Sequence, residues 1–202
     1  MTDRGQTFTL EAFVAAILLM ATVAFALQAV TITSNTASAG ETEIENHHRG
    51  LAEGVLDAAV ENGSLRTTLL YWDESAGQFY NADTEGHYVS RLPQTPNGTA
   101  FGDSLEGTFG ERQIRYNVDL YYRNASGDRQ RQRLVESGTP GENAVRLVET
   151  VTLYDDTTLV GEGGTDRETS LADVEADFYA PNVDDGSPLY NVVRVEVVLW
   201  RT

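Results

Sequence analysis

Residue types that bind metal ions occur at several places in this chain. Glu43 and His47 are four residues apart, so on a helix they would share one side and could hold an ion together, with His48 next to them. The acidic turns at 155–156 and 182–188 (NVDDGSP) carry the oxygen ligands that Ca²⁺ prefers, without the spacing of an EF-hand loop. Because no third ligand accompanies Glu43 and His47, we interpret them as part of a solvated helix surface. We expect no metal and no cofactor.

Patterns typical of enzymes are missing from the sequence. It contains no Gly-x-Ser-x-Gly elbow, His87 alone does not define a triad, and GEGG at 161–164 reads as a turn and not as a phosphate loop. The absence of cysteine excludes disulfides and thiolate chemistry. The basic cluster RQRQR at 129–133 alternates like one face of a strand, which predicts pairing with acidic neighbours, with partner binding as the alternative. We therefore expect a protein that is not an enzyme.

The charge of the chain excludes one class of partner. Its 202 residues carry a net charge of -17, from 31 acidic and 14 basic residues, and every basic residue is an arginine. Phosphates would be repelled by this charge, so we expect no nucleic acid among the partners. Acidity with arginine in place of lysine is typical of proteins from halophiles, where high salt screens the self-repulsion. A disordered acidic tail is disfavoured by the hydrophobic content of 41%.

A carboxylate, Glu11, precedes an apolar run from Ala12 to Val30 that only Thr22 and Gln28 interrupt. The run predicts a membrane-spanning helix, which needs about 20 mostly apolar residues. A carboxylate beside such a segment is costly and usually has a partner or a task. Three interpretations stay open: a packing helix in a filament, a plain anchor, and a secretory signal cleaved after Ala39.

The elements beyond the apolar run follow from periodicity. Ile44, Leu51, Val55 and Ala58 form one apolar stripe on a predicted helix that ends at Asn62-Gly63 and docks on the rest of the domain. Residues 65–110 mix aromatics with turn residues, which predicts short strands or loops. Alternating apolar residues predict strands in the second half of the chain, in RQIRYNVDLYYRN (112–124), RQRQRLVES (129–137), AVRLVETVTLYDD (144–156) and LYNVVRVEVVLWR (189–201). We predict an α+β fold: a long N-terminal hydrophobic helix, then an antiparallel β-rich head packed on the helical extension.

The start of the chain, RGQTFTLEAF, resembles that of type IV prepilins and pilin-like proteins with a class III signal peptide, here of the kind found in halophilic archaea. The resemblance implies that a prepilin-type peptidase cuts between Gly5 and Gln6. It also implies that Glu11 pairs with the freed amine of a neighbouring subunit. Glu11 would be the sixth mature residue, whereas the family usually has its glutamate at the fifth.

The resemblance also implies an organisation and a location. Residues 1–5 would be a leader, 6–36 a transmembrane and filament-core helix, 37–63 a helical extension and 64–202 an extracellular head. The expected partners are the membrane, the peptidase and other pilin-like subunits, and the expected function is structural. An anchored extracellular binding domain and a secreted protein are the alternatives. Candidate N-glycosylation sites in the exported part are Asn62, Asn97 and Asn124.

Overall fold

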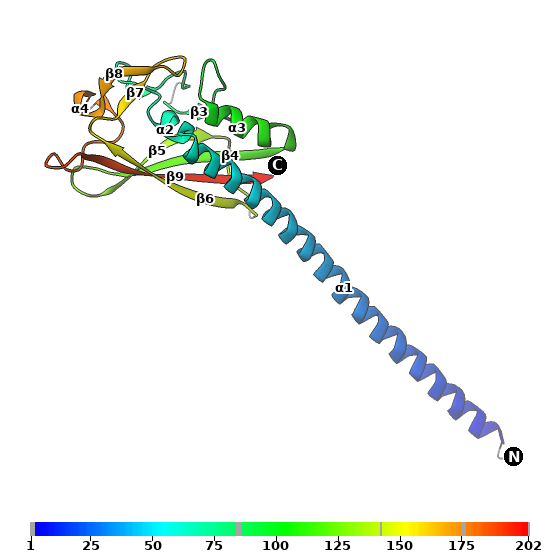
Figure 1. The fold of residues 1–202 in the computed structure, drawn as a ribbon. Coiled ribbons are helices and arrows are strands. Elements are labelled where there is room, and N and C mark those ends of the chain that lie inside the picture. Colours follow the sequence, from blue (N-terminus) through cyan, green and yellow to red (C-terminus); the bar gives the residue numbers. More distant parts are fainter. Residues whose placement is uncertain (1–2, 84–85, 142, 175–176, 202) are drawn as a thin grey trace. The chain divides into compact units, whose positions relative to one another are not determined.

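The structure of the chain is a computed structural model that describes residues 3–83, 86–141, 143–174 and 177–201. Within the first helix, side chains are described for residues 11–25 and from 46 onward. This helix, α1, runs from Asp3 to Glu61 (Figure 1). The chain divides into two compact units, residues 1–46 and residues 47–202, and each is described by itself.

The predicted fold class is wrong in its N-terminal part. In the part of the chain that the structure describes, no helix combines the length and the apolar content needed to cross a bilayer. Beyond Val30, α1 continues through a polar sequence, TITSNTASAGETE, so it is not a hydrophobic helix along its length. What the structure contains is a β-rich domain, in residues 47–202.

The centre of the unit 47–202 is a five-stranded sheet with the order β3-β5-β4-β9-β6. β9 pairs antiparallel with both β4 and β6, and β4 pairs antiparallel with β5. The short β3 pairs parallel with β5. The prediction of an antiparallel sheet therefore holds for every pair except β3 with β5. Its strands are β3 (Tyr88–Val89), β4 (Ile114–Arg123), β5 (Arg129–Glu136), β6 (Val145–Tyr154) and β9 (Leu189–Arg201). The turn predicted at 124–128 joins β4 to β5, as expected.

The alternation in these strands separates a buried side of the sheet from an outer side. Val193, Val195, Val197 and Leu199 of β9 are buried, as predicted, and so are the alternate residues of β4 from Ile114 to Leu120. Because side chains alternate along a strand, the residues between them point to the other side. The register places these intervening residues of β4, β5, β6 and β9 next to one another on the outer side.

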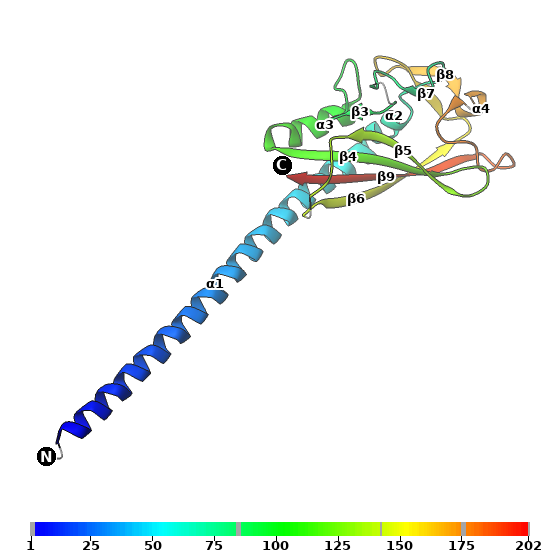
Figure 2. The same cartoon turned by 180° about the vertical axis from the view of Figure 1, so that it is seen from behind.

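Helices cover the buried side of the sheet, as the ribbon shows from both directions (Figures 1 and 2). They are the end of α1, α2 (Ser64–Leu69) and α3 (Ala100–Phe109). The residues of α1 in the core are Ala52, Leu56 and Ala59, while Ala58 is exposed. The predicted stripe is therefore off by one residue, although Leu51 and Val55 lie at its partly buried edge. Gly63, with φ 76, follows the end of α1, as predicted.

Residues 65–110 and 155–188 build the end of the domain beyond the main sheet. Where the sequence predicted short strands or loops, the structure has α2 and α3 as well as strands. The smaller elements are β1 (Trp72–Asp73), β2 (Gln78–Phe79), β7 (Thr158–Val160), β8 (Asp166–Ser170), α4 (Leu171–Val174) and a 3-10 turn, Gly110–Arg112. Trp72 joins these parts, because its ring meets Phe79 and Tyr179 edge-on and its Nε1–H donates to the Asp177 carbonyl at 2.6 Å.

Candidate functional site

The predicted processing and pairing residues all belong to α1. Gly5 and Gln6 are helical in backbone, but their side chains lie outside the described residues, so their role stays a prediction. Glu11 is the first described side chain and is exposed. The apolar residues that follow it are also exposed, among them Phe13 at 67%, Met20 at 74% and Phe25 at 75%. Such a contiguous apolar surface is typical of a segment that packs against a partner or a lipid phase.

The three sequons differ in accessibility. The side chains of Asn62 and Asn97 are exposed, which suits modification. Asn124 is half-buried in the β4–β5 turn, where its Oδ1 accepts the backbone N–H groups of Ser126 at 3.0 Å and Asp128 at 2.8 Å. Asn124 is the least exposed of the three and is therefore the least suited to modification.

The predicted metal ligands form no metal site in the described residues, where no group of three His, Asp or Glu side chains could hold an ion. Glu43 lies outside the residues with described side chains, and the rings of His47 and His48 are 6.2 Å apart between centroids. The two acidic turns do meet, because the Asn182 side chain donates to Asp155 Oδ1 at 3.0 Å. This hydrogen bond uses the carboxylate to join two loops.

His87 is buried beside Glu136, with 3.5 Å between His87 Nε2 and Glu136 Oε2. The hydroxyl of Ser137, the residue after Glu136, donates to the backbone carbonyls of Ser90 and Tyr116. A serine nucleophile must be free to pass its proton to the histidine. The contacts of Ser137 instead anchor the end of β5 to its neighbours.

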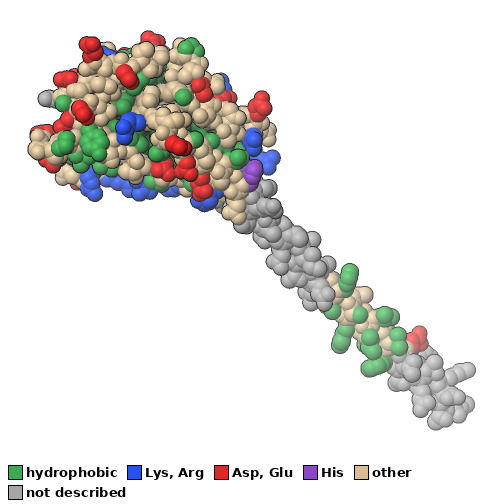
Figure 3. Space-filling view, viewed as in Figure 1, with side chains coloured by type: hydrophobic (Ala, Val, Ile, Leu, Met, Phe, Trp, Pro, Cys, Tyr) green, Lys and Arg blue, Asp and Glu red, His purple; other side chains and the backbone are tan. Residues whose placement is uncertain are grey.

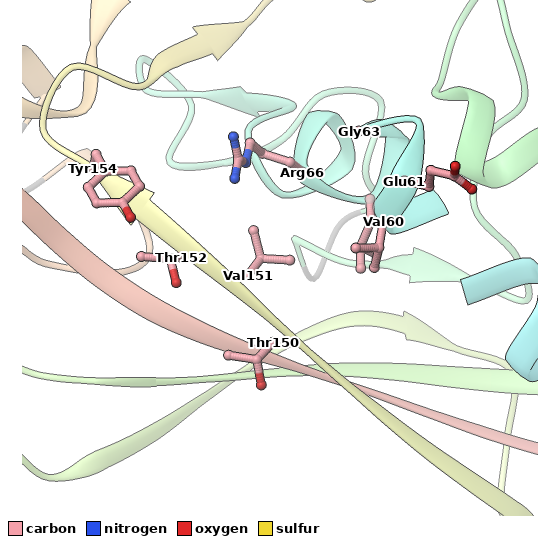
Figure 4. A pocket seen from close by; sticks show the side chains of 9 residues that line it. Val60, Glu61, Gly63, Arg66, Thr150, Val151, Thr152 and Tyr154 are labelled. Carbon is pink, nitrogen blue, oxygen red and sulfur yellow. The ribbon is translucent and has the colours of Figure 1, made fainter. Parts of the chain in front are cut away.

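A hollow of about 500 Å³ lies between the end of α1, the start of α2 and the edge strand β6 (Figure 4). Glu61 and Arg66 are its charged residues. The other lining side chains are apolar or hydroxylic, and no general base stands beside a nucleophile among them. The hollow gives no basis for an enzymatic assignment.

The outer side of the main sheet concentrates positive charge. Seven of the chain's 14 basic residues lie on it, from four adjacent strands, and one of them, Arg115, donates to the Ser137 carbonyl at 3.1 Å. We call the other six the arginine face: Arg123, Arg129, Arg131, Arg133, Arg146 and Arg194. Figure 3 shows a row of arginine side chains along the lower border of the β-rich unit. In a chain of net charge -17 this is an unusual local excess.

Two buried carboxylates hold the arginine face together. Asp119 and Glu196 face each other across β4 and β9, with side chains only 11% and 8% exposed. Asp119 Oδ1 lies 3.2 Å from Arg133 Nε, and Glu196 Oε1 lies 3.5 Å from Arg146 Nη1. Because opposed like charges destabilise a sheet, the arginines around them are part of its structure. The predicted pairing of the 129–133 cluster with acidic neighbours is confirmed for Arg131 and Arg133, whereas Arg129 stacks on Tyr121.

A third carboxylate, that of Glu136, lies at the edge of the arginine face, at the end of β5. It forms an ion pair with Arg133, and the hydrogen bond from that guanidinium lowers the pKa of Glu136. Four of the six arginines, Arg131, Arg133, Arg146 and Arg194, thus share three carboxylates. The guanidinium groups keep donors that these pairs do not use, since each has five N–H groups.

Tyr121 lies at the middle of the arginine face. The guanidinium carbon of Arg129 stands 3.9 Å from the centre of its ring, a cation–π contact that holds the guanidinium flat. Two shallow hollows, of about 270 and about 470 Å³, meet at Tyr121, Arg129 and Arg194. Fixed, planar donors around an open hollow suit carboxylate, sulfate or phosphate groups.

Sequence reasoning identified only part of this face. The RQRQR pattern marked the β5 arginines, and the predicted turn at 124–128 places Arg123 beside Arg129. Arg146 and Arg194, however, are single residues far apart in the sequence, and their strands, β6 and β9, join β4 and β5 only through the sheet order. A signal was present in the alternation of each strand, which places these arginines on the side opposite the valines.

Comparisons with curated proteins and with solved structures find no match for this chain. A family model matches residues 4–199, nearly the whole chain, including both α1 and the β-rich unit. The chain therefore belongs to a family of unknown function, DUF7288.

Proposed function

We propose that this chain is a structural subunit of a pilin-like surface assembly and has no reaction of its own. A prepilin-type peptidase would cut between Gly5 and Gln6, and the N-terminal helix would then pack against the same helix in neighbouring pilin-like subunits. The β-rich unit would face the outside of the cell, at the membrane surface, in a high-salt environment.

The observation that carries the proposal is the exposed apolar surface beside Glu11. Phe13, Leu18, Met20 and Phe25 are each more than half exposed on one helix. Burying one such side chain stabilises an assembly by about 1.5–3 kcal/mol, so this surface favours association. Within a packed bundle, Glu11 would be costly unless a positive charge lay beside it. The new amine of Gln6 in a neighbouring subunit supplies that charge in our proposal.

The mature N-terminus tests the processing step. Mass spectrometry of the cellular protein should find a chain that begins at Gln6. A chain beginning at Gly40 would mean that the helix is discarded and a secreted domain remains. An intact Met1 would contradict peptidase processing.

Shearing of cells tests the assembly step, because filaments come off in the sheared fraction. The protein should be present there, and Glu11→Gln should remove it by leaving the neighbouring amine unpaired. Glu111→Gln is the matched control, since Glu111 is also exposed but lies in the β-rich unit. Equal recovery of both variants would refute the pairing role of Glu11.

An anchored binding module is the second candidate, and the arginine face is the observation that favours it. Under that function the protein would stay with the cells after shearing. Its head would then bind an external anion.

A further inference from the structure

The arginine face has cationic groups beyond those that its own carboxylates use. Arg131, Arg146 and Arg194 have side chains 52%, 63% and 46% exposed, and their closest carboxylate contacts are 3.5–3.9 Å long. Arg129 stacks on Tyr121 and has no ion pair with a described residue. Val148 and Val192, at 37% and 41% exposure, lie on the same side of the sheet. Protein interfaces are enriched in arginine and tyrosine, together with scattered apolar side chains.

A complementary surface lies on the helix that covers the other side of the sheet. Glu53, Asp57 and Glu61 are exposed and four residues apart on the last turns of α1, and we call them the acidic stripe. None of the three forms an ion pair with a residue that the structure describes. The same helix turns place Ala52, Leu56 and Ala59 in the core, so the stripe belongs to the β-rich unit.

We propose that the arginine face of one copy of this chain binds the acidic stripe of a second copy. The spacings agree: carboxylates four residues apart on a helix repeat every about 6 Å, and alternate arginines on a strand repeat every about 6.7 Å. Arg129, Arg131 and Arg133 form such a row along β5. Ion pairs in direct contact of this kind survive high salt better than long-range attraction does.

The two surfaces cannot meet within one copy, because the sheet and its core separate them. They also differ from each other, so the contact is heterologous: each copy offers its arginine face to one neighbour and its acidic stripe to another. Heterologous contacts that do not close into a ring generate open chains of subunits. The inference thus rests on the proposed function and names the contact between heads that would accompany helix packing.

Cross-linking tests the contact directly, because the chain has no cysteine of its own. Arg131→Cys and Asp57→Cys are introduced together into the full chain. A paired arginine and aspartate hold their Cα atoms further apart than the ~7 Å that a disulfide bridges, so a short bis-maleimide reagent is used. Intact cells and sheared filaments should both give a ladder of dimers, trimers and longer chains.

Control variants separate this contact from others. Each single cysteine variant should stay monomeric, since the contact joins two different surfaces. Arg131→Cys with Glu162→Cys, an exposed residue in the β7–β8 turn, should give no ladder. A dimer from Arg131→Cys alone would show two arginine faces in contact and would overturn the proposal.

Comparing the sheared fraction with intact cells distinguishes the contact between heads from the filament function. Protein in the sheared fraction without a ladder from Arg131→Cys/Asp57→Cys would overturn the contact and leave the filament function standing. A ladder in cells with no protein in the sheared fraction would uphold the contact and refute the filament. Charge reversal adds a second measurement: with the cross-linking pair moved to Arg129→Cys and Glu53→Cys, Asp57→Arg should abolish the ladder and Arg131→Asp should restore it.

A sulfated polysaccharide is the rival occupant of the arginine face. Heparin serves as the probe, with the full chain in detergent. Retention on heparin that Arg129→Ala and Arg131→Ala abolish, together with no ladder in cells, would assign the face to an anionic polymer and overturn the proposal.

Discussion

Two neighbouring alanines of α1 offer a sharp test of how the helix docks on the sheet. Ala59 is 1% exposed and lies in the core, while Ala58 is exposed. Replacing each by aspartate adds the same side chain to the same helix turn. Both variants lose about 0.6 kcal/mol of helix propensity, so this cost cancels in the comparison.

The difference comes from burial of the new carboxyl group. At position 59 it would lie in the hydrophobic core, where Ala59 is 1% exposed, so at pH 7 it takes up a proton instead of staying charged. Raising its pKa by three units, from about 4 to about 7, costs about 4 kcal/mol at 1.36 kcal/mol per unit. Ala59→Asp should therefore lower Tm by about 10 °C more than Ala58→Asp.

The assay is thermal and urea unfolding of the full chain, followed by tryptophan fluorescence. Trp72 and Trp200 are both buried in the β-rich unit, so their emission reports on this unit. The cost should shrink as the pH falls toward 4, where the unfolded carboxyl is also protonated. Equal midpoints for the two variants, or a larger loss for Ala58→Asp, would refute this packing of α1.

Three further predictions concern the β-rich unit. Burial raises the pKa of Tyr116 to about 12. The stability due to this group is complete below pH 10, the unfolded value, and falls by up to about 3 kcal/mol as the pH rises to 12. Urea midpoints should follow this fall, and Tyr116→Phe should make it shallower. The buried hydroxyl of Tyr179 has no hydrogen-bond partner among the described residues, so Tyr179→Phe should raise the free energy of unfolding by about 1 kcal/mol; a loss in urea titration would contradict that. In α3, a Cβ at Gly102 would lie 2.3 Å from the Pro93 carbonyl oxygen, whereas one at Gly107 meets nothing within 4 Å. Calorimetry should find Gly102→Ala destabilised by about 1–3 kcal/mol and Gly107→Ala stabilised by about 1 kcal/mol, and the opposite order would refute the helix placement.

The strands of the second half could be predicted because their signal is local. Apolar residues alternate with other residues from Val193 to Leu199, and over such a length a period of two indicates a β-strand with one buried side. The predicted turn at 124–128 is equally local, since Asn124 hydrogen-bonds its own turn. The strands and this turn depend on residues that are near one another in the sequence, so they can be predicted without knowing the order of the strands in the sheet.

The helix phase and the region 65–110 could not be predicted in the same way. Ala58 and Ala59 differ by only 100° around α1, and the choice between them is made by the sheet and by Leu65 and Leu69, which the helix meets only in the fold. Apolar content over residues 12–30 predicted a membrane-spanning helix, whereas no helix in the described part of the chain is long and apolar enough to cross a bilayer.

The sequence alone determined the charge, the absence of cysteine, the strand pattern and the N-terminal resemblance, since each is a property of composition or of near neighbours. The tertiary structure alone decided that arginines from β4, β5, β6 and β9 form one face and that the acidic stripe lies on the other side of the sheet. Such surfaces arise when strands far apart in the chain pair side by side. Their partners in space are set by the packing of the whole core, and no local pattern encodes that order.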